Sequence, residues 1–561
     1  MKPTERKRVL IVGLDGATWD LAGPWAEQGH LPTIRRLRLE GAWGTLQSTV
    51  PALSPPAWTS IITGQNPGKH GVYDFVRREP GSYRLQTMRR DFRRFRTIFR
   101  HLSDEGRRVA AVNIPMTYPP EEINGLFVAG LGAPTNGPFA KPDGLRTDLL
   151  RRGYRIEPRI SFAPGNERAY VTELRDTTKL RANIALDLYR QEPWDLFMVV
   201  FRAPDEAVSF LWHLMDNSHP WHDPELAAEF GDAIQRVYQD ADQALADFLD
   251  VMPDDTNLLA VSDHGGGPLL REVYLNNWLA QQGWLSFRDD EAARSNRTAW
   301  LRRLGLTRES LSRRLKGTPL HRLQDWVPLS WQHRLFPAAT PTLADAVDWS
   351  RTRAYSFGYI GQIYVNLRGR EPQGIVEPGA EYETLLSEIS SALSELRDDQ
   401  DGQPVVDRVY RRDKLYAGPY AGEGPDLNLI MRDMSYITHP RRELAHRDVF
   451  GPVTTNESGT HRVDGLFLAY GPAVAAGQEI SGARVVDIAP TVYHLLGLPV
   501  PAGMDGQVLV TALDGHFMDG HPVTRDERAG ELPDTTQGEA TWSAEEEAEI
   551  LERLRHLGYV D

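Results

Sequence analysis

The stretch RVLIVGLDG (residues 8–16) is a short apolar run that ends in an acidic residue and a glycine. Similar runs of strand length recur along the chain, and they are apolar throughout rather than alternating, as strands covered on both faces are. They are RVAAVNIP (108–115), GLFVAG (125–130), DLFMVVF (195–201), NLLAVSDHG (257–265) and GLFLAYG (465–471). Helical patterns lie between them, so the sequence predicts an α/β fold, a doubly wound, mostly parallel sheet flanked by helices.

The composition of the chain excludes several classes of protein. Of its 561 residues, 41% are apolar and 25% are charged, which is ordinary for a globular protein with a substantial core. The formal net charge of −14 argues against a stable nucleic-acid partner. The chain has no cysteine, which removes disulfides, thiolate metal ligands and cysteine nucleophiles together.

The N-terminal residues do not have the pattern of a signal peptide. Basic residues precede the apolar run at 9–14, but the run is short and no small-residue cleavage site follows it. No stretch approaches the roughly 18 apolar residues that span a membrane. We therefore expect a cytoplasmic protein without a transmembrane segment.

Changes in composition suggest how the chain is organised. Residues 1–514 carry the alternating strands and helices, with arginine-rich segments near 77–108 and 288–346 that read as insertions. These insertions either form a positive rim over a cleft that receives anions or are solvated helix faces paired with acids elsewhere. Residues 515–541 read as a polar linker, and residues 542–561 as a C-terminal amphipathic helix.

Acidic residues and histidines gather at the predicted strand ends. Asp15, Asp205 and Asp263 fall at or a few residues past the ends of apolar runs, where ligands bind in doubly wound sheets. His264 follows Asp263 in a glycine-rich turn, and His461 stands just before another apolar run. Such carboxylates and imidazoles suit zinc or manganese, although an Asp-His pair in a turn can also be purely structural.

A serine precedes two prolines in SPPAWTSIITG (54–64), which predicts a helix starting at or just after Ser54. Two interpretations of Ser54 are open at this point. It could cap the helix by accepting a bond from a backbone N–H group. It could also be a nucleophile whose phosphate lies over the positive end of the helix.

The order of these residues along the chain resembles the alkaline phosphatase superfamily. The matching residues are Asp15-Gly16, Ser54 in LSPPAWTSIITGQNPGKHGV, Asp205, Asp263-His264 and His461. The type I phosphodiesterase/nucleotide pyrophosphatase branch is the most similar, and within it the predicted phosphohydrolase or phosphomutase group. The segments 364–376 and 485–509 also resemble that group. The resemblance implies an alkaline phosphatase-like fold with inserted cap segments.

The resemblance also implies two divalent metal ions, Zn²⁺ first and Mn²⁺ as the alternative. Asp15, Ser54, Asp263 and His264 would hold one ion, and Asp205 and His461 would hold the other. Ser54 would attack phosphorus and form a covalent intermediate. The family usually has a further histidine four residues after the aspartate equivalent to Asp205. That position is Ser209 in this chain, so the second metal site is uncertain.

These observations lead to three hypotheses. The first is a metal-dependent phosphohydrolase, namely a phosphodiesterase or nucleotide pyrophosphatase acting on a small phosphate ester or a nucleotide. The second is a phosphomonoesterase or phosphomutase of the same superfamily. The third, prompted by Ser209, is a catalytically weakened member that binds an anion or a partner. The sequence gives no information about the oligomeric state.

Overall fold

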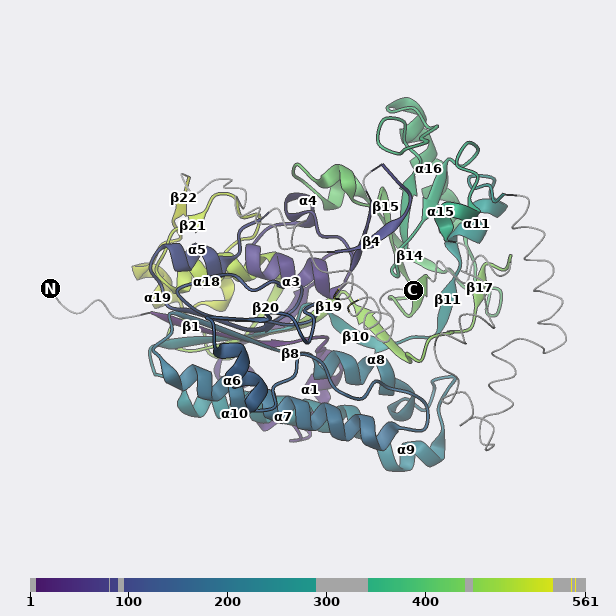
Figure 1. Ribbon diagram of the computed structural model, residues 1–561. Coiled ribbons are helices and arrows are strands. Elements are labelled where there is room, and N and C mark those ends of the chain that lie inside the picture. The colour runs from purple at the N-terminus through teal and green to yellow at the C-terminus, as the bar shows by residue number, and fades with distance from the viewer. Residues whose placement is uncertain are drawn as a thin grey trace.

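The computed structural model describes residues 7–79, 81–88, 95–288, 342–438 and 447–527, together with Glu546 and Ile550. Its centre is a nine-stranded sheet (Figure 1). In spatial order its strands are β20 (Gln478–Arg484), β2 (Ala42–Gln47), β19 (Asp464–Tyr470), β9 (Thr256–Val261), β1 (Arg8–Leu14), β8 (Leu196–Phe201), β5 (Val109–Ile114), β6 (Gly125–Ala129) and β7 (Ala140–Lys141).

The middle of the sheet is parallel, which confirms the predicted fold class. β1 pairs in parallel with β8 and β9, and β5 pairs in parallel with β6 and β8. β19 departs from this pattern because it runs antiparallel to both β9 and β2. An apolar run reports that a strand is covered on both faces and not which way it runs, so its direction could not be predicted.

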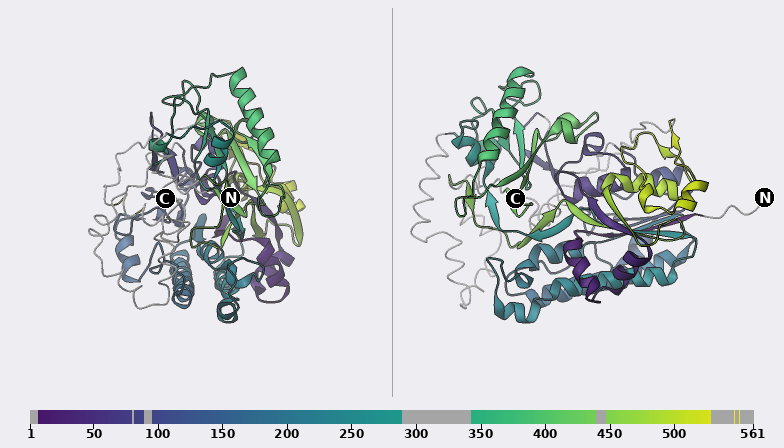
Figure 2. Two further views of the ribbon diagram at one scale, coloured as in Figure 1. Left: turned by 90° about the vertical axis from the view of Figure 1, so that its right-hand side faces the viewer. Right: turned by 180° about the vertical axis from the view of Figure 1, so that it is seen from behind.

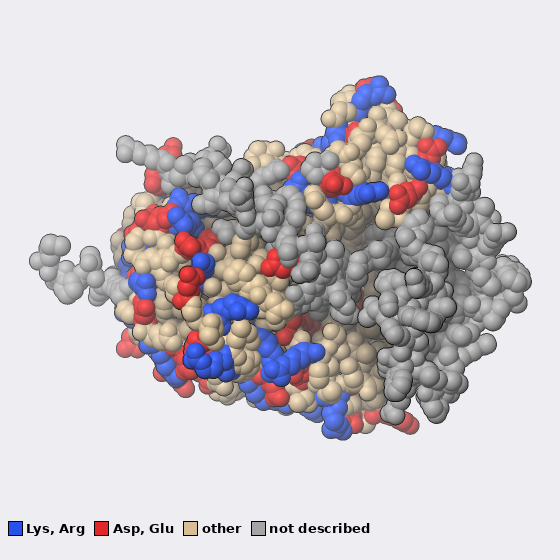
Figure 3. Space-filling view, viewed as in Figure 1, with Lys and Arg blue, Asp and Glu red and all other residues tan. Residues whose placement is uncertain are grey.

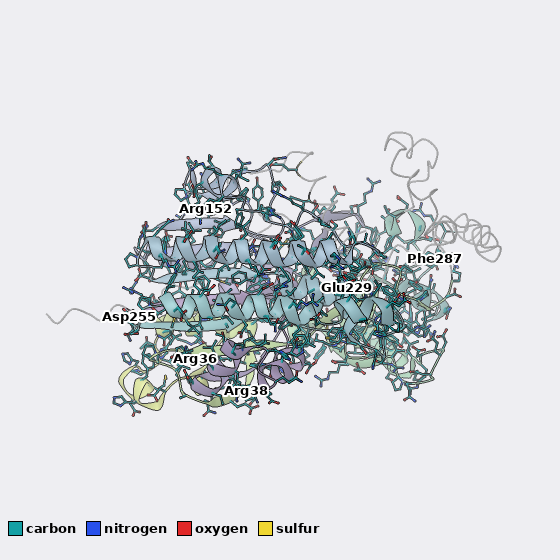
Figure 4. The ribbon with its side chains drawn as sticks, turned by 90° about the horizontal axis from the view of Figure 1, so that it is seen from below. Arg36, Arg38, Arg152, Glu229, Asp255 and Phe287 are labelled. Atoms are coloured by element: carbon teal, nitrogen blue, oxygen red, sulfur yellow. The ribbon has the colours of Figure 1, made fainter. Side chains whose placement is uncertain are left out.

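Helices cover both faces of the sheet (Figure 1). One face carries α1 (Trp19–Glu27), α2 (Pro32–Glu40), α7 (Glu167–Gln191), α8 (Ala203–Met215) and α10 (Ala233–Val251). Figure 4 shows the long helices α7 and α10 lying side by side across it. The opposite face carries α3 (Ser54–Thr63), α5 (Ile98–Asp104) and α18 (Ile488–Leu495). The sheet is therefore a buried layer whose strand ends are the places open to chemistry.

A second hydrophobic core lies beyond one end of the sheet, at the upper right of Figure 1 and on the opposite side in the rear view of Figure 2. It surrounds a four-stranded sheet, in the order β12 (Ala354–Ser356), β13 (Gln362–Val365), β15 (Leu427–Met431) and β14 (Val406–Arg411). Helices α11 (Leu275–Gln281) and α16 (Ala380–Glu395) contribute to this core. The sequence predicts a single unit, residues 1–514, that includes all these residues, and it does not separate this second core.

The segments predicted as insertions, linker and tail are described only in part. Within 77–108, β3 (Val76–Arg78) pairs with β4 (Leu85–Thr87), and most of 288–346 lies outside the described residues. The predicted linker differs from expectation at its start, where α19 (Gly515–Gly520) and β22 (Arg525–Asp526) form. Phe517 packs against the core between the sheet and helices α3, α5 and α18. Of the predicted C-terminal helix, only Glu546 and Ile550 are described, and Ile550 is buried in the core on the side of helices α7, α8 and α10.

The remaining elements are short. The helices are α4 (Pro67–His70), α6 (Leu145–Arg151), α9 (Pro224–Phe230), α15 (Leu343–Ala346) and α17 (Arg412–Leu415). The strands are β10 (Gly265–Pro268), β11 (Arg271–Val273), β16 (Tyr436–Thr438), β17 (Phe450–Gly451), β18 (Gly459–Arg462) and β21 (Val500–Pro501). The 3₁₀ turns are η3 (Ala421–Glu423), η5 (Val485–Asp487) and η6 (Val510–Ala512).

The distribution of surface charge and the character of the helices can be compared with the prediction of no nucleic-acid partner and no transmembrane segment. On the face shown in Figure 3, basic and acidic side chains are interspersed over the described residues rather than gathered by sign. In the part of the chain that the structure describes, no helix combines the length and the apolar character needed to cross a bilayer.

Gly13 marks a close approach between β1 and α3, and it gives a prediction about stability. A Cβ atom at this position would lie 2.5 Å from Trp58 Cη2 and 2.8 Å from Val200 Cγ2. Both neighbours are fully buried, so neither can move aside easily. We expect Gly13→Ala to lower the free energy of unfolding by about 1–3 kcal/mol.

Thermal unfolding followed by circular dichroism measures this effect. Gly515→Ala is the matched control, because Gly515 is the first residue of helix α19, no proline follows it, and a Cβ there would meet no atom within 4 Å. Alanine should leave the stability of that helix unchanged or raise it slightly. Equal melting temperatures for Gly13→Ala and the parent protein would contradict the packing described for Trp58.

Candidate metal centre

The carboxyl ends of three neighbouring strands bring the predicted acidic residues to one edge of the sheet. Asp15 follows β1 directly, Asp263 follows β9 within two residues, and Asp205 lies in the first turn of α8, just after β8. His461 lies on β18, immediately before β19. Because β19 runs antiparallel to β9, its start lies at the same edge as the carboxyl end of β9.

One group of ligand atoms surrounds the Nε2 atom of His264. Asp263 Oδ2 lies 3.4 Å from this nitrogen and Asp15 Oδ1 lies 3.6 Å from it. Ser54 Oγ is 3.2 Å away. The three titratable residues each offer one atom, and these atoms all lie within 4.8 Å of one another. All four side chains are at most 1% exposed.

Bonds on the outer side of each residue fix the orientation of this group. Trp58 Nε1 donates to Asp15 Oδ2 at 3.1 Å, and Gly16 N–H donates to Asp263 Oδ1 at 3.3 Å. His264 Nδ1 lies 2.9 Å from the carbonyl oxygen of Gly265 and can only donate to it. A neutral ring then carries its lone pair on Nε2, facing the two carboxylates. Such outer contacts are typical of metal ligands.

A second group lies next to the first and shares His264 with it. Its members are Asp205, His264 and His461, whose ligand atoms also lie within 4.8 Å of one another. The two imidazole rings are stacked, with centroids 3.7 Å apart and planes 15° apart. His461 Nδ1 lies 2.8 Å from Ala52 O, and Nε2 lies 3.5 Å from Asp205 Oδ1. The histidine nitrogens of both groups therefore face the acidic residues.

Burial and the short distances between the acidic residues shift the pKa values of the site. Burial raises the pKa of Asp15 well above its ordinary value, and the charges of Asp263 and Asp205 raise it further. Burial, with the charge of Asp205, raises the pKa of Asp263 to about 7. Burial and the neighbouring His264 lower the pKa of His461 to about 4. The site thus favours uncharged forms unless a cation is bound.

The donor set fits a divalent cation. Among the described residues, neither Asp15 Oδ1 nor Asp263 Oδ2 accepts a hydrogen bond, although both are buried. Buried polar atoms without partners are costly, so two of them facing one imidazole nitrogen call for an explanation. Carboxylate oxygens with imidazole nitrogens are a usual ligand set for zinc and manganese.

The structure does not support the capping interpretation of Ser54. Leu53 is the residue that caps α3, and Ser54 is the first residue inside the helix, where its side chain makes no capping bond. Pro55 and Pro56 carry no N–H group, and Ala57 N–H bonds to Leu53 O. The Ser54 N–H group is therefore the one backbone donor that the first turn can direct at an anion.

Position 209 leaves the second group without the further histidine of the family pattern. Ser209 lies on α8, and the acidic residue and the histidines near it in the sequence have other contacts. Glu206 pairs with Arg202, and His213 Nδ1 lies 2.8 Å from Ser458 Oγ. His219 and His222 lie within 2.9 Å of backbone carbonyl oxygens.

Sequence reasoning missed two residues that support the site. In the sequence Trp58 is one apolar residue of a predicted helix, but its indole N–H donates to Asp15. Arg202 is 2% exposed and pairs with Glu157 and Glu206, with its Nε 3.9 Å from Asp15 Oδ2. The position of Arg202 at the end of a strand, directly before APD, was the one available signal.

His70 and Lys69 do not join the candidate site. Lys69 binds Asp505 at 2.6 Å and Gly503 O at 2.9 Å. His70 is fully buried, accepts the N–H of Val72 on Nδ1, and has its Nε2 at 3.0 Å from Ser60 Oγ. Both residues therefore tie the α4 turn to its surroundings.

The buried His70 gives a prediction about acid stability. Burial lowers its pKa from 6.5 to about 3, so between these values the unfolded chain binds a proton that the folded chain does not. Stability is therefore full above pH 6.5 and falls as the pH drops below it. Between pH 7 and pH 5 the parent protein should lose about 2 kcal/mol more than His70→Gln, which has no group that titrates there. Denaturant unfolding at both pH values measures the difference, and equal losses would contradict the assignment.

Comparisons with known proteins bear on the family and the fold of the chain. The family model described as type I phosphodiesterase / nucleotide pyrophosphatase matches residues 9–464. Phosphonoacetate hydrolase from Sinorhizobium meliloti 1021, solved with phosphonoacetate, superposes with a TM-score of 0.52 at 14% identity, over 88% of this chain and 96% of that one. Its complex with phosphonoformate gives a TM-score of 0.51 at the same identity and coverage. A search of curated proteins found no match.

Proposed function

We propose that this member of the type I phosphodiesterase/nucleotide pyrophosphatase family is metal-dependent and acts through Ser54. Its family makes the chain a hydrolase of phosphoric ester or phosphoanhydride bonds. The proposed activity is that of a phosphodiesterase or nucleotide pyrophosphatase. Two divalent ions are proposed. Asp15, Ser54, Asp263 and His264 would hold the first, and Asp205 with His461 would hold the second. Zn²⁺ is the expected metal and Mn²⁺ the alternative.

The observation that carries the proposal is the position of Ser54 Oγ. It lies 3.2 Å from His264 Nε2, the same atom that the Asp15 and Asp263 carboxylates face. The Ser54 hydroxyl makes no capping bond to its own helix, so its contact with His264 does not accompany a capping role. Nucleophiles are recognised by such contact with the groups that activate them.

The proposed reaction proceeds in two steps through the Ser54 oxygen. A divalent cation, when bound, lowers the pKa of a hydroxyl that it touches and offsets the charge of phosphate oxygens. Ser54 loses its proton to solvent and attacks phosphorus, and the bond from phosphorus to the leaving oxygen breaks. The leaving oxygen takes a proton from water. A second water then attacks phosphorus, restores the Ser54 hydroxyl and releases the phosphate monoester.

The outer contacts keep this arrangement in place during the reaction. Trp58 and Gly16 N–H each hold one oxygen of a carboxylate, so that the other oxygen faces inward. The carbonyl groups of Gly265 and Ala52 do the same for the two imidazole rings. Fixed ligands cost little reorganisation when charge develops on the phosphate.

A substrate panel tests the proposal. Metal-free protein is given Zn²⁺ or Mn²⁺ and then bis-p-nitrophenyl phosphate, p-nitrophenyl phosphate, a dinucleotide and phosphonoacetate in parallel. We expect release of p-nitrophenol from the diester at a kcat/KM at least tenfold above that for the monoester. Faster turnover of the monoester would favour the phosphatase or phosphomutase alternative. Inactivity with every substrate and metal would favour a binding protein and overturn the proposal.

A further inference from the structure

The segment before His461 runs alongside helix α8, next to the second group of ligands. At one end, His461 Nε2 lies 3.5 Å from Asp205 Oδ1. Further along, a Cβ atom on Gly459 would meet the carbonyl oxygen of Val208 at 2.1 Å. At the other end, Ser458 N–H donates to Ser209 O at 2.8 Å. The residue that follows in this direction, Glu457, therefore lies beside position 209.

Glu457 is a buried carboxylate that the reaction described above does not use. Its side chain is 9% exposed and accepts one bond, at 3.2 Å, from the neutral hydroxyl of Thr455. Burial raises its pKa to about 8, and the charge of Asp205 adds to this effect. The Glu457 carboxyl is thus within electrostatic range of Asp205. A buried acid normally has a cationic partner, and a neutral hydroxyl does not provide one.

We infer that Glu457 is the third protein ligand of the second ion, in the role that a side chain at position 209 would otherwise fill; this inference rests on the two-ion function proposed above. A carboxylate oxygen is a hard ligand that both Zn²⁺ and Mn²⁺ accept. The Glu457 side chain has three rotatable bonds, and among the described residues the hydroxyl of Thr455 is the donor that its carboxylate meets. The serine hydroxyl at 209 is shorter and uncharged.

Counting bound ions tests this inference without measuring activity. Metal-free protein is dialysed to equilibrium against a series of Mn²⁺ concentrations, and bound manganese per chain is determined by elemental analysis. The variants are Glu457→Gln, which keeps the shape and removes the charge, and the double variant Ser209→His with Glu457→Gln. Glu272→Gln is the control, because Glu272 is a fully buried neighbour bonded to Tyr274 and Thr454. Circular dichroism checks that each variant is folded.

The expected result is two ions per chain for the parent protein and for Glu272→Gln. Glu457→Gln should bind the first ion normally and the second at least about tenfold more weakly. The double variant should regain the second ion, since its histidine supplies a ligand from α8. Unchanged binding of two ions by Glu457→Gln would overturn the inference and leave the proposed function intact. A single ion in the parent protein would overturn both the inference and the second site of the proposed function.

Discussion

Ser54→Ala should lower kcat toward the phosphodiester by about three orders of magnitude or more, while most of the bound metal remains. The alanine removes the oxygen that attacks phosphorus, so no covalent intermediate can form. The other ligands of the first group, Asp15, Asp263 and His264, are unchanged, and their outer bonds do not involve Ser54. Steady-state kinetics with metal analysis of the same sample measures both quantities.

Ser60→Ala is the matched control for this variant. Ser60 is a buried serine of the same helix, and its hydroxyl contacts His70 rather than the ligand groups. We expect kcat to change less than about threefold in Ser60→Ala, with a lower melting temperature from the lost bond. Turnover at the parent rate in Ser54→Ala would rule out the assigned nucleophile.

Asp263→Asn should remove the first ion and, with it, hydrolysis. The amide keeps the shape of the side chain and can still accept the Gly16 N–H bond. It loses the negative charge that faces His264 Nε2 at 3.4 Å. We expect metal affinity to fall at least tenfold and kcat/KM to fall about a hundredfold or more. A chelator should abolish the activity of the parent protein, and added metal should restore it there but not in Asp263→Asn.

The same substitution should stabilise the metal-free protein at alkaline pH. The pKa of Asp263 is raised from 3.8 to about 7, so the folded state holds a proton that the unfolded state releases between these values. The stability of metal-free parent protein therefore falls as the pH rises through this range, and an asparagine removes that loss. We expect a higher melting temperature for metal-free Asp263→Asn than for the parent at pH 8.

Asp242→Asn is the matched control for Asp263→Asn, because it changes a buried carboxylate that is not a proposed metal ligand. Asp242 is buried and accepts the N–H groups of Thr33 and Ile34 at the start of α2, away from the ligand groups. This control should melt at a lower temperature and retain its full metal content. If Asp263→Asn kept its metal in the same assay, the assignment of Asp263 as a ligand would be wrong.

The sequence could place most of the first candidate group at one edge of the sheet because strand ends are visible in an apolar pattern. Asp15 and Asp263 end runs that are buried on both faces, and parallel neighbours place such ends at one edge. His264 follows directly from this, since it is adjacent to Asp263. Ser54 and His461 were also visible as candidates, but only the family resemblance connected them to the others, because no periodicity does.

Features that depend on tertiary contacts could not be predicted in this way. The capping role of Ser54 stayed open in the sequence because serine before proline suits both interpretations. In the structure Leu53 takes the cap position, and the Ser54 hydroxyl contacts His264, 210 residues away. The antiparallel direction of β19, which brings His461 to the site, is invisible to a hydrophobic pattern. Arg202 is charged and yet 2% exposed. Its burial could not be predicted because its ion-pair partner Glu157 comes from a separate segment of the chain.

Anomalous diffraction from crystals soaked in Mn²⁺ is the most direct test of the central claim, that Asp15, Asp263 and His264 hold a divalent ion beside Ser54. The account predicts an anomalous peak about 2.0–2.3 Å from Asp15 Oδ1, Asp263 Oδ2 and His264 Nε2, with Ser54 Oγ in its ligand sphere. A fully soaked crystal with no peak among these atoms, or with manganese bound only elsewhere, would contradict it.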